Sequence, residues 1–180
     1  LTLSKKSDTS SKHEFLVGTR FGVRNIEFSD EAIQEMDFDK IYLNIDKIIH
    51  EDELVLVEEF IVTFKDVLGF YYSDHAVYTI CKKLGLTHKL IYNPGTLVTN
   101  VKDAEFYLSL GIKRVCLSRE ITLKDILKFS HLKEKVEIII HGKLNMFYSK
   151  RKLLTNYFDY IKQDVVKKGV LQEEIRDEHY

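Results

Sequence analysis

The sequence predicts an α/β fold in which parallel strands alternate with helices, as in a (β/α) barrel of the TIM type that is shortened or incomplete. Short apolar segments rich in β-branched and aromatic residues recur every 21 to 27 residues, with helical segments between them. These segments are continuous rather than alternating, which is typical of strands covered on both faces. A chain of 180 residues is also short for eight such units, which usually take ~250 residues.

Six segments are expected to be strands. They are Glu14–Gly18, Lys40–Ile45, Val67–Tyr72, His88–Tyr92, Lys113–Leu117 and Val136–Ile140. Leu1–Ser4 would be a seventh strand that precedes them. Because no linker or low-complexity segment interrupts the pattern, we assign residues 1–180 to a single barrel-like domain.

The segments between the predicted strands carry helix start and stop signals. Ser29 is a suitable N-cap, and Thr122 opens a helix that runs to Phe129. The segment that begins at Ser73 stops at Gly85, and Val101–Leu110 is likewise followed by a glycine. We therefore expect four helices here.

The segment Glu53–Lys65 gives two conflicting signals. Val55, Val57, Ile61 and Val62 favour a strand, whereas its place in the alternation requires a helix. Both interpretations stay open at this point.

The composition narrows the class of protein. The chain has 27 Lys and Arg against 28 Asp and Glu, and 44% of its residues are apolar, so it is not a disordered tail. No run approaches the ~18 apolar residues of a membrane-spanning helix. The first residues, Leu1-Thr-Leu-Ser-Lys-Lys, lack an apolar signal core. With two cysteines only, we expect a cytoplasmic protein with no membrane segment.

Functional groups in a barrel gather where strands end and the following loops begin. The polar residues at these positions are Arg20, Arg24, Asn44, Asp46, Asp74, His75, Asn93, Asn100, Arg119, Glu120 and His141. From this set we select Asn100, Arg119, Glu120 and His141 as catalytic candidates. Structural roles are the alternative: Arg119 and Glu120 as a loop ion pair, and His141 as a hydrogen-bonded histidine.

A basic and aromatic segment spans residues 141–158. Its cations and one of its rings are the candidates for RNA binding: Lys143, Tyr148, Lys150, Arg151 and Lys152. Cations that neutralise phosphates beside rings that stack on bases are typical of proteins that bind single-stranded RNA. The alternative is a solvated basic helix face above buried aromatic residues.

Other chemistries have little support in the sequence. Cys81 lies on the apolar face of a predicted helix and Cys116 lies within a strand, so both are expected to be buried rather than nucleophilic. Paired-histidine and Cys-x-x-Cys patterns are absent, as are glycine-rich phosphate loops. We expect no metal and no nucleotide cofactor.

Residues 137–158 resemble the signature of peptidase family U32, a family of collagenase-like proteins of unknown catalytic type. The similarity is greatest to the short members found in Firmicutes. Further segments agree in order with the family pattern: Gly18–Arg24, Tyr42–Asp46 with His50–Leu54, Val98–Asn100, Val115–Glu120 and Leu171–Tyr180. The family pattern continues beyond the last of these, so this chain is expected to lack its C-terminal part.

The resemblance implies a barrel-type domain in a family whose members are labelled proteases. Better understood relatives act in oxygen-independent hydroxylation of RNA bases or quinone precursors, including the wobble uridine of tRNA. Those relatives commonly hold an iron–sulfur cluster through cysteines, two of them in this signature. Asn145 and Lys152 stand at these two places, and since such clusters need thiolate ligands, we expect none on this chain.

Three functions follow from the resemblance. The first is a component of tRNA wobble-uridine hydroxylation that works on tRNA with a longer paralogue that keeps the cysteines. The second is a non-catalytic scaffold or partner subunit of a longer family member, in an oligomer. The third is a genuine collagenase-like peptidase, for which the sequence offers no nucleophile–base pair.

Overall fold

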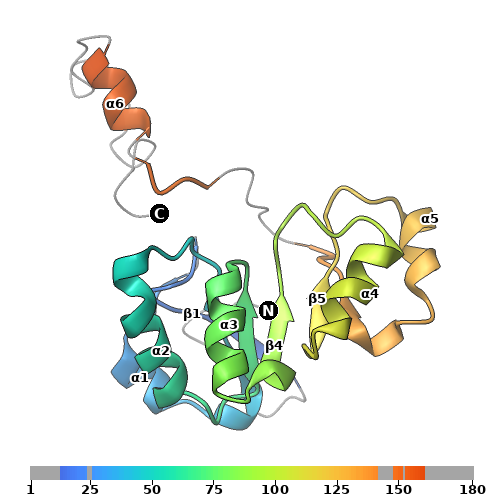
Figure 1. Cartoon of the computed structure of the whole chain (residues 1–180), viewed down its shortest axis with the longest axis horizontal. Coiled ribbons are helices and arrows are strands. Elements are labelled where there is room, and N and C mark those ends of the chain that lie inside the picture. Colours follow the sequence, from blue (N-terminus) through green and yellow to red (C-terminus); the bar gives the residue numbers. More distant parts are fainter. Residues whose placement is uncertain (1–12, 24–25, 142–147, 152, 161–180) are drawn as a thin grey trace. The chain divides into compact units, whose positions relative to one another are not determined.

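The computed structural model describes residues 13–23, 26–141, 148–151 and 153–160. The chain forms two compact units, residues 1–143 and 144–180. The first unit contains all the described strands and five of the α-helices, and the second contains helix α6 (Leu153–Tyr160) (Figure 1).

Six parallel strands form one sheet in the first unit. They are β1 (Phe15–Gly18), β2 (Ile41–Ile45), β3 (Gly69–Tyr72), β4 (Leu90–Tyr92), β5 (Arg114–Cys116) and β6 (Val136–Glu137). Each strand pairs with the next along the chain, and the sheet curls into a half-barrel. This sequential order is the topology of a (β/α) barrel. A strand lies within each of the six predicted segments, whereas Leu1–Ser4 lies outside the described residues.

Helices alternate with the strands. The α-helices of this unit are α1 (Asp30–Gln34), α2 (Leu54–Thr63), α3 (His75–Lys83), α4 (Val101–Ser109) and α5 (Leu123–Ile126). Short 3₁₀ helices cover Phe38–Lys40, Glu51–Glu53, Thr87–Lys89, Leu127–Phe129 and Lys133–Lys135. Five predicted strands begin one or two residues later than expected. For two of them the reason is that Lys40 and His88 belong to 3₁₀ turns.

The two faces of the sheet bury different side chains. Residues such as Val17, Leu43 and Phe70 belong to the large core that also includes helix residues. Their neighbours along the strands point the other way, and Tyr42, Ile91 and Cys116 form a second, smaller cluster. This second face is the inner face of the half-barrel.

The predicted helix ends are confirmed, with two differences. The segment predicted as one helix to Phe129 is α5 to Ile126 and a 3₁₀ helix over Leu127–Phe129. The side chains of Ser29 and Thr122 accept hydrogen bonds from the first turns of α1 and α5. Asp74, rather than Ser73, caps α3. Gly85 has a φ of +72°, a backbone conformation that glycine adopts readily at a helix end.

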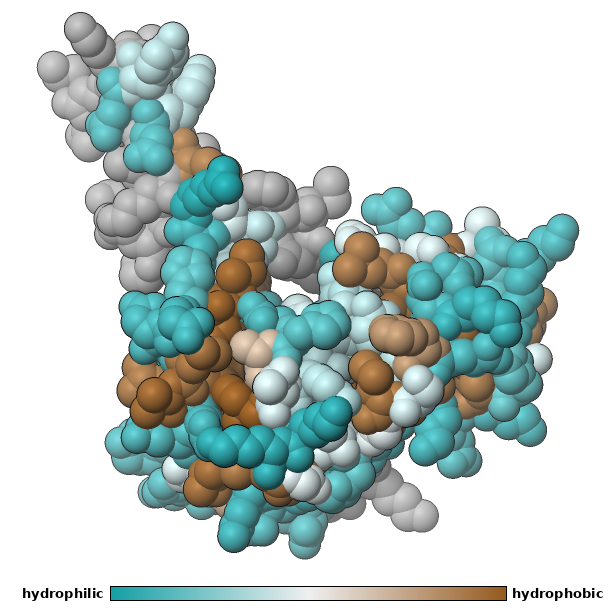
Figure 2. All heavy atoms as spheres, viewed as in Figure 1, coloured by the Kyte–Doolittle hydropathy of each residue, from teal (hydrophilic) through white to brown (hydrophobic). Residues whose placement is uncertain are grey.

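The ambiguous segment Glu53–Lys65 is helical. Val57, Phe60 and Ile61 are buried, which is the spacing of one helix face. The ring of Phe60 packs edge-on against Phe21 at 5.3 Å. Burial of this face therefore outweighs the low helix propensity of the β-branched residues in α2. Apolar side chains also gather on its outer surface, where Val55, Leu56 and Val62 are exposed (Figure 2).

The prediction for Val136–Ile140 is wrong in its second half. The strand ends at Glu137, and Ile138, Ile139 and Ile140 are 44%, 50% and 88% exposed. The expectation of a strand covered on both faces fails here because β6 is an edge: among the described strands, β6 pairs with β5 alone. In the described part of the chain, no helix is long and apolar enough to cross a membrane.

Candidate functional site

Asn44 and Asp46 lie together at the carboxyl end of β2. Asn44 is on the inner face, because its neighbours Leu43 and Ile45 belong to the helix-side core. Its Nδ2 donates to Asp46 Oδ1 at 2.9 Å, and the backbone N–H of Val23 donates to the same oxygen at 2.6 Å. Burial raises the pKa of the Asp46 carboxyl, and these two hydrogen bonds oppose that rise.

The loop after β1 covers Asn44 closely. Thr19 Oγ1 donates to the Asn44 carbonyl at 2.6 Å and accepts from the N–H of Phe21. A Cβ at Gly22 would lie 3.2 Å from Asn44 Nδ2, so only glycine fits without movement. Asn44 Oδ1 is buried and has no hydrogen-bond partner among the described residues. At the end of β2, the partly buried Asp46 carboxyl thus lies beside Asn44, whose Oδ1 accepts no hydrogen bond from the described residues.

The next strand ends are held by their own side chains. Asp74 accepts hydrogen bonds from Ile49 N–H at 3.0 Å and Ala76 N–H at 2.9 Å, so it links two loops. Ser73 Oγ donates to the Asn93 carbonyl at 2.7 Å. Since these groups already have partners, their main effect is to fix the loops around the strand ends.

Arg119 and Glu120 follow β5, as predicted. Arg119 Nε lies 3.4 Å from the carbonyl of Gly95, which connects this loop to the one after β4. Ser118 is buried, and its hydroxyl accepts from the N–H of Glu120. Glu120 itself is exposed. Within the described residues, no ion pair joins Arg119 to Glu120, so the alternative of a loop ion pair is not supported.

The four catalytic candidates are not joined by side-chain interactions. In the part of the chain that is described, no hydrogen bond or ion pair links any two of Asn100, Arg119, Glu120 and His141. Asn100 caps α4, accepting from Asp103 N–H at 3.0 Å and donating to its carboxylate at 2.7 Å. His141 is exposed. Their catalytic roles stay predictions.

Two buried hydroxyls were not selected from the sequence. Thr19 and Ser118 each directly follow a predicted strand, and both are almost fully buried. Their position directly after a predicted strand could have identified them as candidates for the site. Their residue type could not, because serine and threonine are common in any loop.

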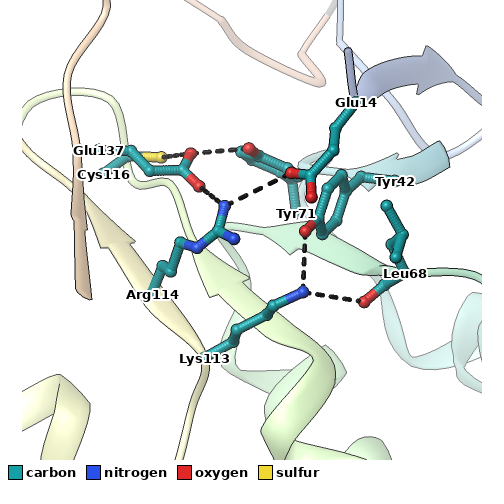
Figure 3. A network of polar contacts seen from close by, with 8 residues as sticks. All are labelled: Glu14, Tyr42, Leu68, Tyr71, Lys113, Arg114, Cys116 and Glu137. Atoms are coloured by element: carbon teal, nitrogen blue, oxygen red, sulfur yellow. Dashed lines mark hydrogen bonds and ion pairs between the residues drawn. The ribbon is translucent and has the colours of Figure 1, made fainter. Parts of the chain in front are cut away.

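A polar network crosses the inner face toward the amino ends of β1 and β5 (Figure 3). Arg114 Nη1 lies 2.8 Å from Glu137 Oε1 and 3.8 Å from Glu14 Oε2. Tyr71 donates to Glu137 Oε2 at 2.7 Å, and the Cys116 thiol lies 3.6 Å from the same oxygen. The network therefore connects β3, β5 and β6 with Glu14, the residue before β1, through two carboxylates and one guanidinium.

A lysine adds a second arm to this network. Lys113 Nζ donates to the hydroxyl of Tyr42 at 2.8 Å and lies 3.4 Å from the carbonyl oxygen of Leu68. Because the amino-terminal side of a barrel ordinarily serves stability, we assign the network to holding the sheet in its curled form.

The environment keeps the network's phenols and thiol protonated. Burial raises the pKa of Tyr42 to about 12, and burial together with Glu137 raises that of Tyr71 further. The pKa of Cys116 is raised well above its usual range by burial and by Glu137. Burial also raises the pKa of Cys81 to about 12. Neither thiol is suited to act as a nucleophile at neutral pH.

The two cysteines do not fit an iron–sulfur cluster. Cys81 lies in the helix-side core and Cys116 in the inner-face cluster, and both are buried as thiols. Clusters need thiolate ligands that converge on one point. Asn145 and Lys152, which replace the family's ligands, lie outside the described residues, so the expected lack of a cluster stays a prediction.

Among the described residues, one group of side chains could hold a metal ion. Ligand atoms of His50, Asp52 and Glu53 lie within 4.8 Å of one another before α2. The N–H of His50 donates to Glu53 Oε2 at 2.8 Å, which is the arrangement of a helix capping box. Helix capping accounts for this arrangement without a metal.

The basic and aromatic segment is described in part, in the second unit. Arg151 is exposed, whereas Tyr148 and Lys150 are half-buried. Lys143 and Lys152 lie outside the described residues. In α6 the rings of Tyr157 and Phe158 are 5.5 Å apart, and Tyr157 and Tyr160 are 56% and 85% exposed. The alternative of a basic face above buried aromatics is therefore wrong for Tyr157, whereas Tyr160 lies just beyond the segment 141–158.

A parallel half-barrel with polar side chains at the carboxyl ends of its strands defines a protein of the (β/α)-barrel class. Within that class, the pattern of peptidase family U32 matches residues 14–165, and the chain belongs to this family. The match includes every described strand.

Curated relatives were found in two bacteria. The chain is 31% identical over 157 residues to tRNA hydroxylation protein P2 of Bacillus subtilis, which covers 81% of this chain and 51% of the relative. It is 27% identical to tRNA hydroxylation protein P1 of the same organism, covering 79% of this chain and 36% of the relative. It is 25% identical to tRNA hydroxylation protein P of Helicobacter pylori, covering 76% of this chain and 36% of the relative.

The chain therefore spans about half the length of P2 and about a third of the others. No solved structure matches the chain significantly.

Proposed function

We propose that the chain is a component of tRNA hydroxylation that acts at the wobble uridine. The observation that supports this proposal most is the similarity to relatives named tRNA hydroxylation proteins, which extends over 157 residues. The chain covers 51% of P2 and 36% of P1. We propose that it works with a longer paralogue and that the cytoplasm is the place of action.

The proposed contact with tRNA is the basic and aromatic segment. Arg151 is exposed just before α6, and Tyr157 and Tyr160 expose their rings along it. A cation pairs with a phosphate, and a ring stacks on a base of any identity. Since the net charge is −1, attraction to RNA has to come from such a local patch.

The mouth of the half-barrel is the proposed place for the base. Asp46 and Asn44 lie where barrel proteins hold their substrates. The desolvated Asp46 carboxyl can hold a proton at a higher pH than an ordinary aspartate. Arg119 links the loop after β5 to the loop after β4 through its contact with the Gly95 carbonyl.

A peptidase function has less support. Both cysteines are buried with raised pKa values. The Ser73 hydroxyl is engaged with the Asn93 carbonyl rather than with a base. Incubation of the purified chain with gelatin or casein, beside a His141→Ala variant, should show no cleavage that depends on His141.

The proposed RNA contact is tested by titrating the purified full chain with an anticodon stem–loop of tRNA. Arg151→Glu should weaken binding and lower the salt slope by about one, because one phosphate contact is lost. Tyr157→Ala should weaken binding roughly tenfold, and Tyr157→Phe should preserve it because stacking needs only the ring.

Lys124→Glu is the matched control for the charge change. Lys124 is exposed on α5, in the other unit. If Lys124→Glu weakened binding as much as Arg151→Glu, the contact would be non-specific and the assignment of this segment would be wrong.

A further inference from the structure

The two oxygens of the Asp46 carboxyl have different surroundings. Oδ1 accepts hydrogen bonds from the N–H of Val23 at 2.6 Å and from Asn44 Nδ2 at 2.9 Å. Within the described part of the chain, no hydrogen bond from another residue reaches Oδ2. The side chain is only partly buried. The fold therefore holds the carboxyl through one oxygen and leaves the other for a further donor.

Ion pairing does not satisfy Oδ2 either. Among the residues that the structure describes, no ion pair includes Asp46. The neighbouring Lys47 donates Nζ to the carbonyl of Arg20 at 2.6 Å, and Arg20 pairs with Asp30 at 3.3 Å. Asp46 also lies outside the one group of three metal-ligating side chains found in the described residues. A carboxylate that is partly withdrawn from water needs hydrogen-bond donors, so a ligand with an N–H or O–H group fits this position.

The turn after β1 fixes the direction of the carboxyl. Thr19 Oγ1 donates to the carbonyl of Asn44 at 2.6 Å. A Cβ at Gly22 would lie 3.2 Å from Asn44 Nδ2 and 3.2 Å from the Thr19 carbonyl oxygen, so the turn packs directly on the amide. Because Nδ2 is also a donor to Asp46, these contacts set the direction in which Oδ2 is presented. Thr19, Gly22 and Asn44 are thus positioning residues.

Asn44 provides a second indication that this strand end binds something. The residue is 2% exposed, and its Oδ1 has no hydrogen-bond partner among the described residues. Most buried polar atoms in native proteins are paired, so an exception requires a specific explanation. Both Asn44 and Asp46 lie at the carboxyl end of β2, which is the end where barrel proteins bind their ligands. The chain has thus gathered acceptors here without matching donors.

Uracil carries a matching donor in a distinctive place. Once N1 is bonded to ribose, the ring has one N–H group, at N3, between two carbonyl groups. Cytosine has a bare lone pair at N3 instead. A carboxylate oxygen attracts the N3–H group and repels the lone pair, and proteins that recognise single-stranded RNA bind bases through this edge.

On the basis of the proposed function, we infer that Asp46 determines specificity for the wobble uracil, because its Oδ2 accepts a hydrogen bond from N3–H of the base. Oδ1 is already engaged by Val23 and Asn44, so Oδ2 is the oxygen that meets the base. A site built to hydrogen-bond one group of its substrate rejects analogues that lack this group. The feature selected here is the N3–H group rather than the shape of a pyrimidine.

The test compares two anticodon stem–loops that differ by one methyl group. One carries uridine at the wobble position and the other carries 3-methyluridine, and the purified full chain is titrated with each at about pH 7.5. Binding is followed by fluorescence anisotropy. Wild type should bind the uridine stem–loop about tenfold more tightly, because methylation removes a hydrogen bond to a charged group.

Asp46→Asn separates the lost hydrogen bond from a clash with the methyl group. The amide oxygen of the variant can still accept from Val23 and Asn44, which places an NH₂ group where N3–H would donate. Binding of the uridine stem–loop should fall about tenfold, and the two stem–loops should then bind within about twofold of each other. A clash with the methyl group would preserve the difference in the variant.

Asp39→Asn is the matched control. Asp39 is exposed in the 3₁₀ helix that precedes β2, at the opposite end of the same strand. This variant should bind both stem–loops as wild type does. Circular dichroism and urea unfolding establish whether Asp46→Asn is folded, and the comparison of the two stem–loops on wild type tests the inference without any variant.

Two kinds of result would contradict the inference. Equal binding of the two stem–loops by wild type, or an undiminished difference in Asp46→Asn, would overturn the role of Asp46 and leave the proposed contact with tRNA standing. A lack of binding to either stem–loop by wild type would overturn the proposed function, and the inference with it.

Discussion

Asp46 differs from an ordinary surface carboxyl because it is partly buried at the end of β2. Burial raises its pKa, so the folded state holds the proton more tightly than the unfolded state does. The contribution of Asp46 to stability is therefore present at low pH and lost as the pH rises through the raised pKa.

Asp46→Asn tests this pH dependence. The amide oxygen of the variant can still accept from Val23 and Asn44, but it does not titrate. Relative to the variant, the stability of wild type should fall as the pH rises from the unfolded pKa of aspartate, about 3.9, through the raised pKa of the folded state. The measurement is urea unfolding of both proteins across this range. A wild-type advantage that grew with pH would contradict a raised pKa.

Arg114 is the residue on which the inner network depends. Its side chain is 26% exposed and that of Glu137 is 23% exposed. Arg114→Met would leave Glu137 partly buried without its cation, and we expect a loss of about 1–3 kcal/mol in the free energy of unfolding.

A surface ion pair provides the control for Arg114. Lys102 pairs with Glu105, but its side chain is 90% exposed. Lys102→Met should cost less than about 0.5 kcal/mol, because solvent screens such pairs. Equal losses in the two variants, measured by urea unfolding, would show that the network adds nothing beyond a surface contact.

At this scale the sequence located strand-end residues but could not rank them. Asn44 and Asp46 were among the strand-end candidates because they follow an apolar run. The burial of Asn44, however, depends on Gly22 and Thr19, more than 20 positions earlier in the chain. Asn100 was selected for catalysis, yet it caps its own helix. A cap and a substrate contact use the same residue types, so only the folded loops distinguish them.

At the scale of elements, α2 is the segment on which two sequence signals disagreed. Val55 and Val57 would lie on one face of a strand, since side chains two apart share a face. In the helix they lie on different faces: Val57 is fully buried and Val55 is 66% exposed.

Substitution of each valine by alanine discriminates between the two structures. Val57→Ala should destabilise the protein by about 1.5–3 kcal/mol through lost burial and a cavity. Val55→Ala should be neutral or stabilise by up to ~0.5 kcal/mol, because alanine is the better helix former. Similar losses at both positions, in the same unfolding assay, would contradict the helix.

Strand positions were predictable because each strand of a parallel sheet is a short apolar run between turn signals. The lengths of the strands could not be predicted in the same way. The apolar run from Val136 to Ile140 has the composition of the other strands, but its pairing stops at Glu137. Pairing depends on a neighbouring strand, and the composition of a segment does not reveal whether that neighbour is present.

At the scale of the whole molecule, the alternation of strands and helices was enough to predict a partial barrel. The sheet has six parallel strands in sequential order. The arrangement of the inner network could not be predicted, because Glu14, Arg114 and Glu137 are distant in sequence and meet only when the sheet curls.

The most direct test of the account is the hydroxylation of tRNA in cells. Total tRNA from a strain that lacks the gene would be digested to nucleosides, and hydroxylated wobble uridine would be measured by mass spectrometry. The account predicts a clear fall in this nucleoside and its recovery when the wild-type gene is restored. An unchanged level in the deletion strain would contradict a role in tRNA hydroxylation.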